Sequence, residues 1–448
     1  MKDVIIIGAG FSGLAAAKTL HAQHISFVLL EARDRIGGRV YTKRFENGKY
    51  LDFGGQWIGP GQDRMYALCE EYGIDFYETY NQGRHILDLN GKIKKYKGLI
   101  PRLDIFSLLN LDWLMRKLES MAKEITSISP WNHPKASTWD QLTLEDFIRK
   151  HSYTKNCHKV INIALETVFA SELKEISLLH ALFYFKSGRN LNTLINIQDG
   201  AQQHRIVGGM QGLAEKIAAP FQEYISYNHA VKEVRSIDNE IWVHGDGFEL
   251  KAKKLILAIP PPLARDIKFH PQLATSKSEL LQKLEMGTVG KCFMVYKEPF
   301  WRKDGFSGQA FADENSPFQS IFDSSPKDGE YGVILAFTIA DRAEQFFKKT
   351  KKERQKSFLD KLVDYFGAQA ASPLFYEDFT MTDEKWSKGC YAALYPTNTW
   401  TKYEDTLSMG ENSVFWAGTE ASPEWYGYIE GAVRSGETAA RNVISSLI

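Results

Sequence analysis

Residues 4–13 read VIIIGAGFSG. The β-branched run at 4–7 predicts a strand that is buried on both faces of a parallel sheet, and glycines follow it directly. Residues 14–20, LAAAKTL, have strong helix propensity, and residues 25–30, ISFVLL, predict a second strand. The stretch therefore predicts a strand, a glycine turn, a helix and a strand, which together start a dinucleotide-binding sheet.

Each glycine of the turn has a physical reason in this context. Gly8 allows the tight turn, Gly10 lets the backbone approach a pyrophosphate, and Gly13 lets the helix pack closely on the strand. Glu31 ends the second strand, where a carboxylate would accept hydrogen bonds from an adenosine ribose. A glycine turn that binds nothing is the weaker alternative. The turn alone does not separate nicotinamide from flavin cofactors.

The composition is that of a large globular protein. The 448 residues are 44% hydrophobic and 25% charged, which excludes a disordered or fibrous chain. Lys and Arg together number 55, as do Asp and Glu, so no net field attracts nucleic acid or an anionic membrane. Because no long apolar window and no signal peptide is visible, we expect a soluble cytoplasmic protein without a membrane anchor or a nucleic-acid partner.

The four cysteines, Cys69, Cys157, Cys292 and Cys390, lie far apart in the sequence. They form no CxxC and no Cys/His metal spacing, and a large core needs no disulfide. We therefore expect reduced thiols and no metal site.

A second glycine pair follows the first unit. Residues 31–40, EARDRIGGRV, bring cations and further main-chain N–H groups toward a diphosphate. This stretch resembles the EAxxRxGGR motif of the flavin amine oxidase superfamily, with Arg35 and Arg39 at its arginines. The resemblance implies FAD rather than NAD, with Arg33 and Arg39 among the cofactor-binding residues. Residues 51–60, LDFGGQWIGP, resemble the family's segment along the flavin ring, which implies contacts from Gly54, Gly55, Gln56 and Trp57.

The middle of the chain predicts helices and then a sheet. Helical periodicity from 100 to 186 predicts a mainly helical insertion, and alternation from 281 to 384 predicts an antiparallel sheet. Between them, Val231 matches a family position whose main chain holds adenine.

Lys291 matches the lysine that the resemblance places near flavin N5 through a water, where a desolvated ammonium would assist oxygen reduction. An ordinary surface lysine is the alternative.

The C-terminal stretch gives the most specific resemblance. Residues 414–436 contain WAGTE and GYIEGAVRSG, which resemble the closing FAD motif of monoamine oxidases. The resemblance implies that Glu420 holds the cofactor near its ribityl diphosphate and that the backbone near Ile429 faces the pyrimidine end. Cys390 matches a cysteine that is bonded to the flavin methyl in some relatives, so FAD attached through Cys390 is expected, with a buried free thiol as the alternative.

Two tyrosines match the aromatic cage of monoamine oxidases. Opposed rings of Tyr391 and Tyr428 would direct a substrate nitrogen toward the flavin. With Lys291, they are the predicted catalytic residues. The resemblance also places Ile195, Gln202, Thr167 and Val168 on the wall of the substrate cavity.

We therefore predict an α/β fold with a doubly wound, Rossmann-like FAD-binding domain and an inserted α+β substrate domain. The FAD-binding domain would comprise residues 1–80, 204–280 and 385–448, and the substrate-binding domain residues 81–203 and 281–384. As a monoamine oxidase, the protein would oxidise a neutral amine to an imine. Dioxygen would reoxidise the flavin to give hydrogen peroxide, and water would release aldehyde and ammonia. The sequence allows a homodimer but does not decide the oligomeric state.

Other functions stay open. An L-amino-acid oxidase needs a cation for the substrate carboxylate, for which Arg64 is a candidate. A polyamine oxidase needs carboxylates in its cavity. A non-oxidase FAD-binding module is less compatible with the two cage tyrosines, and the second glycine pair argues against a nicotinamide-dependent dehydrogenase.

Overall fold

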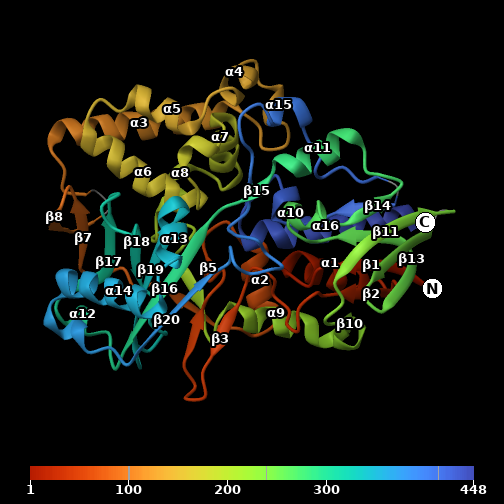
Figure 1. The fold of residues 1–448 in the computed structure, drawn as a ribbon, viewed down its shortest axis with the longest axis horizontal. Helices are drawn as coiled ribbons and strands as arrows, with labels where there is room; N and C mark the ends of the chain where they lie inside the picture. Colours follow the sequence, from red (N-terminus) through yellow and green to blue (C-terminus); the bar gives the residue numbers. More distant parts are fainter. Residues whose placement is uncertain (99–100, 239, 412, 448) are drawn as a thin grey trace.

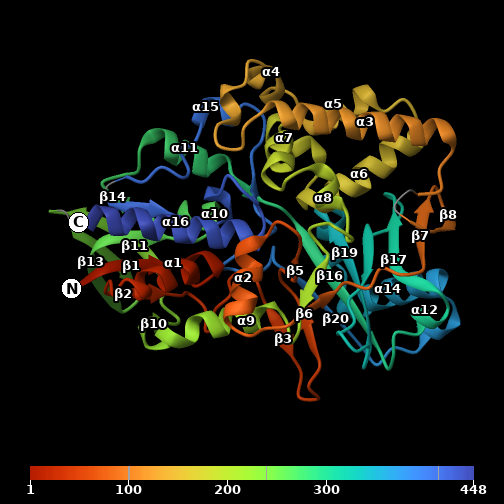
Figure 2. The same cartoon turned by 180° about the vertical axis from the view of Figure 1, so that it is seen from behind.

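Two large β-sheets organise the fold (Figure 1). The structure is a computed structural model that describes residues 1–98, 101–238, 240–411 and 413–447. Ile100, with which the predicted helical stretch begins, lies outside the described residues. In both views the first sheet lies at the end of the molecule that carries the two termini, and the second sheet lies at the other end (Figure 2).

The first sheet is built around the strand that the opening motif predicts. Its strand order is β10-β2-β1-β13-β12-β11-β14, and β22 also pairs with β13. Strands β2, β1, β13 and β22 run parallel, whereas β12 is antiparallel to β13. Ile5 of β1 faces Val28 on one side and Leu255 on the other, and it is fully buried. The bounds are β1 Lys2–Ile7, β2 Phe27–Leu30, β10 Ile225–Ser226, β11 Val231–Ile237, β12 Glu240–Gly245, β13 Phe248–Leu257, β14 Lys268–His270 and β22 Val414–Trp416.

Helices from the two ends of the chain pack together beside this sheet. Helix α1 (Phe11–Ala22) starts directly after the glycine turn, and α16 (Ile429–Leu447) follows the C-terminal motif. The two helices meet at glycine: a Cβ on Gly436 would lie 2.0 Å from the main-chain oxygen of Ser12. At the start of α1, a Cβ on Gly13 would lie 1.9 Å from the oxygen of Gly8. Both contacts therefore require glycine.

The second sheet has the order β20-β16-β19-β18-β17-β7-β8. Its strands from the 281–384 stretch pair antiparallel, as the alternation predicts, whereas β17 and β7 pair parallel. Every residue of β16 and β19 is buried, because other elements cover both faces there. The bounds are β7 Arg84–Leu89, β8 Lys92–Tyr96, β16 Val289–Tyr296, β17 Phe306–Ala312, β18 Ser320–Asp323, β19 Gly332–Ile339 and β20 Phe375–Thr380.

A group of helices from the middle of the chain lies beside the second sheet (Figures 1 and 2). These are α3 Ile105–Glu124, α4 Ala136–Asp140, α5 Leu144–His151, α6 Lys155–Phe169, α7 Leu178–Ser187 and α8 Leu191–Ile195. Several start at a side-chain cap; Asp104, for example, accepts a hydrogen bond from the N–H of Ser107 at the start of α3. The predicted helical insertion is thus observed in its described residues. No helix in the described ranges is both long and apolar enough to cross a membrane.

Shorter elements connect these parts. Three small sheets pair β3 with β4, β15 with β21, and β5 and β6 with β9. Their bounds are β3 Thr42–Arg44, β4 Tyr50–Asp52, β5 Trp57–Ile58, β6 Phe76–Glu78, β9 His204–Ile206, β15 Glu285–Met286 and β21 Ala393–Leu394. The remaining α-helices are α2 Asp63–Glu71, α9 Met210–Ala218, α10 Pro261–Ala264, α11 Thr275–Lys283, α12 Phe300–Lys303, α13 Ala340–Phe347, α14 Lys351–Phe366 and α15 Trp400–Tyr403.

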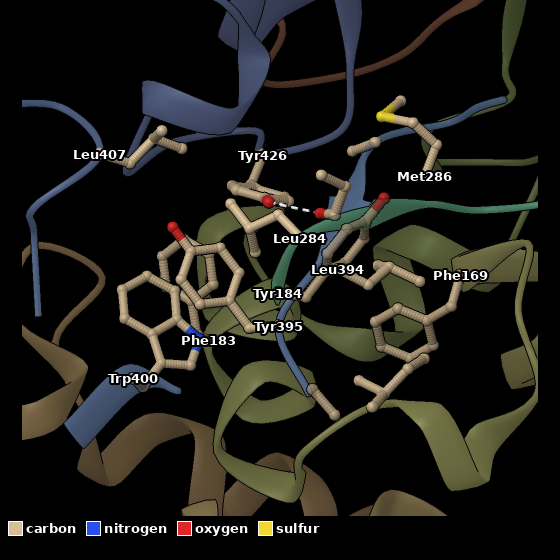
Figure 3. Packing of buried hydrophobic residues seen from close by; sticks show 14 of the residues in the cluster. Phe169, Phe183, Tyr184, Leu284, Met286, Leu394, Tyr395, Trp400, Leu407 and Tyr426 are labelled. Atoms are coloured by element: carbon tan, nitrogen blue, oxygen red, sulfur yellow. Dashed lines mark hydrogen bonds between the residues drawn. The ribbon is translucent and has the colours of Figure 1, made fainter. Parts of the chain in front are cut away.

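An aromatic cluster joins the C-terminal segment to the helical group (Figure 3). Tyr395 stacks on Trp400 with ring centroids 4.3 Å apart, and Phe183 of α7 lies 4.8 Å from Trp400. The hydroxyl of Tyr426 donates to the main-chain oxygen of Ala393 over 2.5 Å. Burying rings of this size supplies a large hydrophobic contribution and fixes the segment that carries two predicted site tyrosines.

The first sheet draws its strands from residues 2–30, 225–270 and 414–416, which lie within the three stretches predicted for FAD binding. The exact borders between an FAD-binding and a substrate-binding domain stay a prediction.

The contact between α1 and α16 predicts a specific sensitivity to side-chain volume. We expect Gly436→Ala to lower the free energy of unfolding by about 2 kcal/mol, because the new Cβ meets main-chain oxygen and the helices must separate. The matched control is Gly212→Ala in α9, where the nearest atom is the end of the Arg44 side chain at 3.7 Å. Helix propensity alone should stabilise this control by up to about 1 kcal/mol. Equal effects of the two substitutions in urea unfolding would contradict the proposed contact.

Candidate active site

One cavity of about 910 Å³ connects the glycine turns of the first sheet to the helical group. It brings together most of the predicted site residues, although they come from segments far apart in the sequence. Those that line it are Gly8, Gly10, Glu31, Arg33, Arg39, Gly54, Gly55, Gln56, Trp57, Thr167, Val168, Ile195, Gln202, Val231, Lys291, Cys390, Tyr391, Tyr428 and Ile429. Two predicted residues, Gly13 and Glu420, are not among the described lining residues.

The two glycine turns face each other at one end of the cavity. Gly37 donates its N–H to the oxygen of Ala9 over 2.9 Å, and a Cβ on Gly38 would lie 3.1 Å from Cα of Gly10. A Cβ on Gly10 would have no protein atom nearer than 3.9 Å, so this position opens toward the cavity. The N-terminus of α1 starts here, and in the described structure the buried hydroxyl of Ser12 has no hydrogen-bond partner. Free N–H groups, an unused hydroxyl and open space above glycine fit a diphosphate.

Glu31 lies at the end of β2, as predicted, and holds the first turn. Its carboxylate accepts from the N–H of Ala9 at 2.8 Å and from the N–H of Arg33 at 2.9 Å. The Arg33 guanidinium pairs with Glu384 and donates to the hydroxyl of Ser387 at 2.8 Å. The carboxylate therefore lines the cavity in an orientation that main-chain N–H groups determine.

The second turn is shaped by an arginine outside the cavity. Arg35 donates to the main-chain oxygens of Gly38 at 3.2 Å and Val40 at 3.1 Å. In the part of the chain that the structure describes, Arg35 does not line the cavity, whereas Arg39 does. Of the two arginines in the EAxxRxGGR resemblance, one stabilises the turn and the other reaches the cavity wall.

Glu420 reaches the cavity through Arg39. The two side chains form a two-point ion pair, with Nη1–Oε1 at 2.5 Å and Nη2–Oε2 at 3.0 Å. Arg39 also donates to the main-chain oxygen of Tyr391 at 2.8 Å. Burial lowers the pKa of the guanidinium, but the opposing effects, of which those of Glu420 are the largest, outweigh it and the pKa of Arg39 rises. Glu420 therefore keeps a positive charge fixed beside the cavity.

Lys291 is buried in β16 and faces the 52–57 segment. Its ammonium donates to the oxygens of Asp52 at 3.0 Å and Gly54 at 2.7 Å, and to Oε1 of Gln56 at 2.9 Å. Burial lowers the pKa of Lys291 from its ordinary value of 10.5 to about 7, against the attraction of Asp52. Lys291 is therefore a buried residue and not a surface lysine. Its proposed role depends on the cofactor and is considered below.

Three tyrosines line one part of the cavity. Tyr391 and Tyr428 are the predicted pair, and Tyr184 of α7 lies with its ring centroid 6.2 Å from that of Tyr428. Burial raises the pKa of all three phenols, so the rings are neutral. Sequence reasoning missed Tyr184 because it lies in an apolar stretch of helix that resembles ordinary core.

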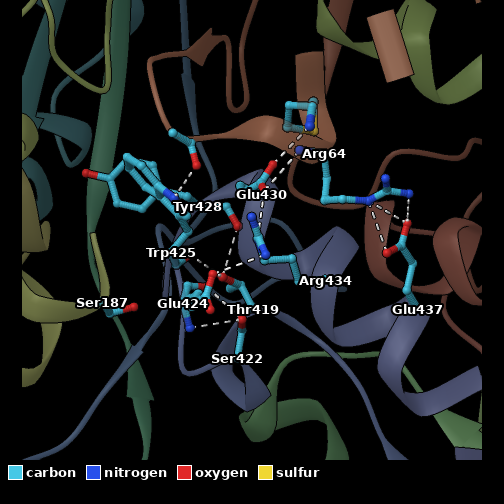
Figure 4. A network of polar contacts seen from close by, with 12 residues as sticks. Arg64, Ser187, Thr419, Ser422, Glu424, Trp425, Tyr428, Glu430, Arg434 and Glu437 are labelled. Carbon is cyan, nitrogen blue, oxygen red and sulfur yellow. Dashed lines mark hydrogen bonds and ion pairs between the residues drawn. The ribbon is translucent and has the colours of Figure 1, made fainter. Parts of the chain in front are cut away.

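The loop that carries Tyr428 is held by a polar network (Figure 4). Trp425 packs on Tyr428 with centroids 5.2 Å apart and donates its indole N–H to the oxygen of Gly61 at 2.8 Å. The hydroxyl of Thr419 donates to the main-chain oxygen of Tyr428 at 3.0 Å. Trp425 thus packs against the ring of Tyr428, while Thr419 holds its main chain.

Glu430 connects the same loop to helix α2. It is fully buried and accepts from the N–H groups of Arg64 at 3.2 Å and Met65 at 2.9 Å, while Arg434 donates to it at 2.7 Å. The Arg64 guanidinium binds Glu437 (Figure 4) and is absent from the described lining of the cavity. Arg64 is therefore not positioned to bind a substrate carboxylate in this cavity.

Cys390 is buried beside the tyrosines and lines the cavity. Its main-chain N–H donates to the oxygen of Gly287 at 2.9 Å. Burial raises the pKa of the thiol to about 12, although Lys291 and Arg39 act in the opposite direction. The side chain is thus a neutral thiol at neutral pH.

The cavity wall supplied by the helical group and the second sheet is mostly apolar. Thr167 and Gln202 turn their donors to the main-chain oxygens of Ile163 at 2.7 Å and Leu194 at 3.1 Å. The hydroxyl proton of Thr167 and one amide N–H of Gln202 are therefore already used in hydrogen bonds. The sequence did not predict the apolar side chains that complete this wall, which are Leu111, Met115, Ile163, Ile197, Phe311, Phe322 and Phe337.

Carboxylates are scarce around the cavity. Within the described lining they are Glu31, Asp112 and Asp266. Glu31 holds the first glycine turn, and Asp266 pairs with Lys388. Asp112 is exposed on α3 and binds Arg116. No group of three metal-binding side chains occurs among the described residues.

Comparison with known proteins identifies the family. A family model described as flavin-containing amine oxidoreductase matches residues 11–444. This chain belongs to that family. It is similar to flavin-containing amine oxidase B of Cavia porcellus, with 35% identity over 99% of this chain and 86% of that protein. It is 34% identical to flavin-containing amine oxidase A of Canis lupus familiaris, over 100% of this chain and 86% of that protein.

Solved structures of bacterial-type amine oxidases have the same fold. Cyclohexylamine oxidase from Brevibacterium oxydans superposes with a TM-score of 0.95 at 28% identity, over 100% of this chain and 99% of that chain. Putrescine oxidase bound to putrescine superposes with a TM-score of 0.94 at 28% identity, over 99% of both chains. The predicted α/β fold class and the prediction of a flavin-dependent amine-oxidising enzyme that acts on small amines are confirmed.

The buried Arg39–Glu420 pair predicts that removing the charge of Glu420 destabilises the fold. We expect Glu420→Gln to lower the free energy of unfolding by about 3 kcal/mol, because it leaves a buried guanidinium without its countercharge. We also expect weaker retention of flavin on gel filtration. Glu437→Gln is the matched control, since it also faces an arginine at two points but in a more exposed pair, and should cost at most about 1 kcal/mol. The measurement is urea unfolding. Similar losses of unfolding free energy in both variants would contradict the expectation that the buried Arg39 needs its carboxylate more than the exposed Arg64 does.

Proposed function

We propose that the chain catalyses the oxidative deamination of small primary monoamines, with dioxygen as electron acceptor. The products would be hydrogen peroxide and an imine, which water converts to aldehyde and ammonia. The observation that carries the proposal is that Tyr391, Tyr428 and Lys291 line the same cavity as the two glycine turns, and that the helical group and the second sheet give this cavity a mostly apolar wall.

The residues present fit FAD. The diphosphate would lie at the N-terminus of α1 between Gly10 and Gly38, with Arg33 and Arg39 supplying positive charge. Glu31 and the main chain at Val231 would hold the adenosine. The 54–57 segment, Tyr428 and Ile429 would contact the flavin end. When bound, FAD supplies the two-electron acceptor for the reaction.

Tyr391 and Tyr428 would orient the amine. Neutral rings with electron-rich faces accept a polarised C–H and N–H group without competing for its proton. The apolar wall disfavours the ammonium form of the substrate, so the amine enters neutral and leaves its proton in water at the mouth. Thr167 and one N–H of Gln202 direct their donors to the main chain, and most of the remaining wall that the hydrocarbon part of the substrate would contact is carbon.

Lys291 would assist the reaction with dioxygen. An ammonium held by three oxygens in a buried site stabilises negative charge that develops on oxygen without having to reorient. We propose this role for the ammonium form only, since a neutral amine has no charge to contribute.

The contacts favour monoamines over the other substrates that the sequence leaves open. A diamine needs a carboxylate for its second ammonium, and Asp112, the only carboxylate of the described helical wall, is exposed and bound to Arg116. An amino acid needs a cation, and Arg64 is bound to Glu437 instead. A homodimer and a cytoplasmic location stay predictions, as does the proposed division into two domains.

Substrate choice can be tested with three compounds that share one carbon chain: n-pentylamine, 1,5-diaminopentane and L-norleucine. We expect kcat/KM for pentylamine to exceed that of either other compound by at least about 100-fold, because the second charge has no partner in the cavity. The measurement is peroxide release in a coupled peroxidase assay. Preference for the diamine or the amino acid would select that alternative, and bound flavin without turnover would favour a non-oxidase module.

We also propose that Cys390 bonds the flavin methyl group. Forming a thioether from a thiol and a methyl group releases two electrons and two protons, which dioxygen accepts to give peroxide. We expect yellow colour to stay with the acid-precipitated protein, and Cys390→Ala to release it to the supernatant. Cys292→Ala is the control, because this thiol is buried within β16 and does not line the cavity among the described residues. Colour in the supernatant of the unaltered protein would overturn the attachment but not the oxidase function.

A further inference from the structure

A buried ion pair lies next to Lys291 and outside the cavity lining. Asp52 in β4 and Arg205 in β9 have side chains that are 1% and 3% exposed, and their closest charged atoms are 3.6 Å apart. In the described structure neither residue lines the cavity. The three residues come from segments around positions 52, 205 and 291, so no sequence motif connects them.

Asp52 contacts Lys291 through its main chain. Its carbonyl oxygen accepts from Nζ of Lys291, while its carboxylate oxygen Oδ1 accepts from the hydroxyl of Thr42 at 2.6 Å and the N–H of Met210 at 3.1 Å. These bonds hold the carboxylate in place whatever the charge of Lys291. The other carboxylate oxygen, Oδ2, faces Arg205 and has no hydrogen-bond partner among the described residues.

Arg205 is equally constrained. It donates from Nη1 to the main-chain oxygen of Ser325 at 3.0 Å, and its guanidinium lies 5.6 Å from the ring centroid of Tyr77. Its Nε has no partner within the described residues. A guanidinium keeps its charge at any pH at which the protein is folded, so Arg205 is a permanent cation in this buried region.

The charges of this region do not balance when Lys291 is protonated. The titratable groups that act on Lys291 are Asp52, Arg205 and the thiol of Cys390, which burial keeps neutral. Aromatic rings cover the ammonium on other sides, with the centroids of Trp57 and Phe337 at 5.8 Å and 5.4 Å. Lys291 and Arg205 then share the carboxylate of Asp52, because Asp323, which also acts on Arg205, is already paired with Arg302. Because a buried unbalanced charge is unfavourable and Arg205 cannot lose its proton, Lys291 is the group that gives up its charge.

We propose that Arg205 and Asp52 are positioning residues that together set the charge of Lys291, and thereby the pH range in which the enzyme reacts with dioxygen. This inference rests on the role of Lys291 in the proposed function. Arg205 favours the neutral amine by repulsion, and Asp52 favours the ammonium by attraction. The lowered pKa of Lys291 agrees with a site in which burial and Arg205 outweigh Asp52.

Two substitutions should therefore shift the pH at which the oxygen reaction declines in opposite directions. Arg205→Gln removes the competing cation and should raise the pH at which the oxygen reaction declines by about one unit or more. Asp52→Asn removes the countercharge but keeps an oxygen for Thr42 and Met210, and should lower that pH by a similar amount. A purely structural disturbance would move both charge-removing variants in the same direction.

The first readout is the oxygen reaction of the flavin-loaded enzyme. Protein reduced anaerobically with pentylamine is mixed with oxygenated buffer from about pH 5 to about pH 9, and its return to yellow is followed. The unaltered protein should slow as pH rises through about 7, and Lys291→Met should be slow and independent of pH. Arg64→Gln, which removes a distant ion pair, is the control and should leave the transition in place.

The second readout does not depend on turnover. Because the folded pKa of Lys291, about 7, lies below its ordinary value of 10.5, the lysine's contribution to stability is constant below pH 7 and rises with pH between these values. The difference in unfolding free energy between each protein and its Lys291→Met counterpart should therefore begin to rise at higher pH in Arg205→Gln and at lower pH in Asp52→Asn. If amine oxidation fails but these shifts appear, the proposed function is wrong and the charge control stands. If neither variant shifts either transition, the inference is overturned.

Discussion

Main-chain atoms approach one another so closely at the start of helix α1 that no side chain larger than hydrogen fits, and much of the structure depends on this contact. Gly13 lies over the oxygen of Gly8, and Gly436 of α16 lies over the oxygen of Ser12. The first contact places the N–H groups of α1 at the end of β1. The second brings the C-terminal helix against the same loop. The cofactor end of the cavity is thus assembled from the two ends of the chain, and a single added methyl group would separate them.

Charge in the cavity is arranged by residues that do not line it. Arg35 shapes the second glycine turn, Glu420 holds Arg39, and Glu430 caps α2 beside the loop of Tyr428. The same logic extends to Asp52 and Arg205 behind Lys291. Each of these groups is fixed by hydrogen bonds to the main chain or to a buried partner, so the electrostatic environment is set before any substrate enters. Preorganised charge of this kind is effective because water is excluded and little has to reorient during the reaction.

The part of the cavity that is lined by the helical group and the second sheet carries little charge. Helix α6 and the second sheet supply carbon surface, and Thr167 of α6 directs its hydroxyl to the main chain. An apolar wall binds hydrocarbon without specifying its shape in detail, and it penalises a second charge on the substrate. In the function that we propose, this combination of a charged cofactor end and a largely uncharged substrate end would favour monoamines over diamines and amino acids.

The sequence by itself determined those features that depend on local backbone geometry. The glycine turns, the strand at 4–7, the second glycine pair and the C-terminal motif each require particular residues at fixed spacing. Contiguous stretches were therefore enough to predict the fold class, the flavin and many of the residues at the cofactor end of the cavity. Only the tertiary structure decided which side chains meet across distant segments. In the tertiary structure Tyr184 lies beside Tyr428, and Glu420 and Gly13 lie outside the described cavity lining. Arg64 binds Glu437, and Arg205 and Asp52 lie together near Lys291. Such contacts depend on how sheets and helices pack in three dimensions, and side-chain packing has no signature in the spacing of residues along the chain.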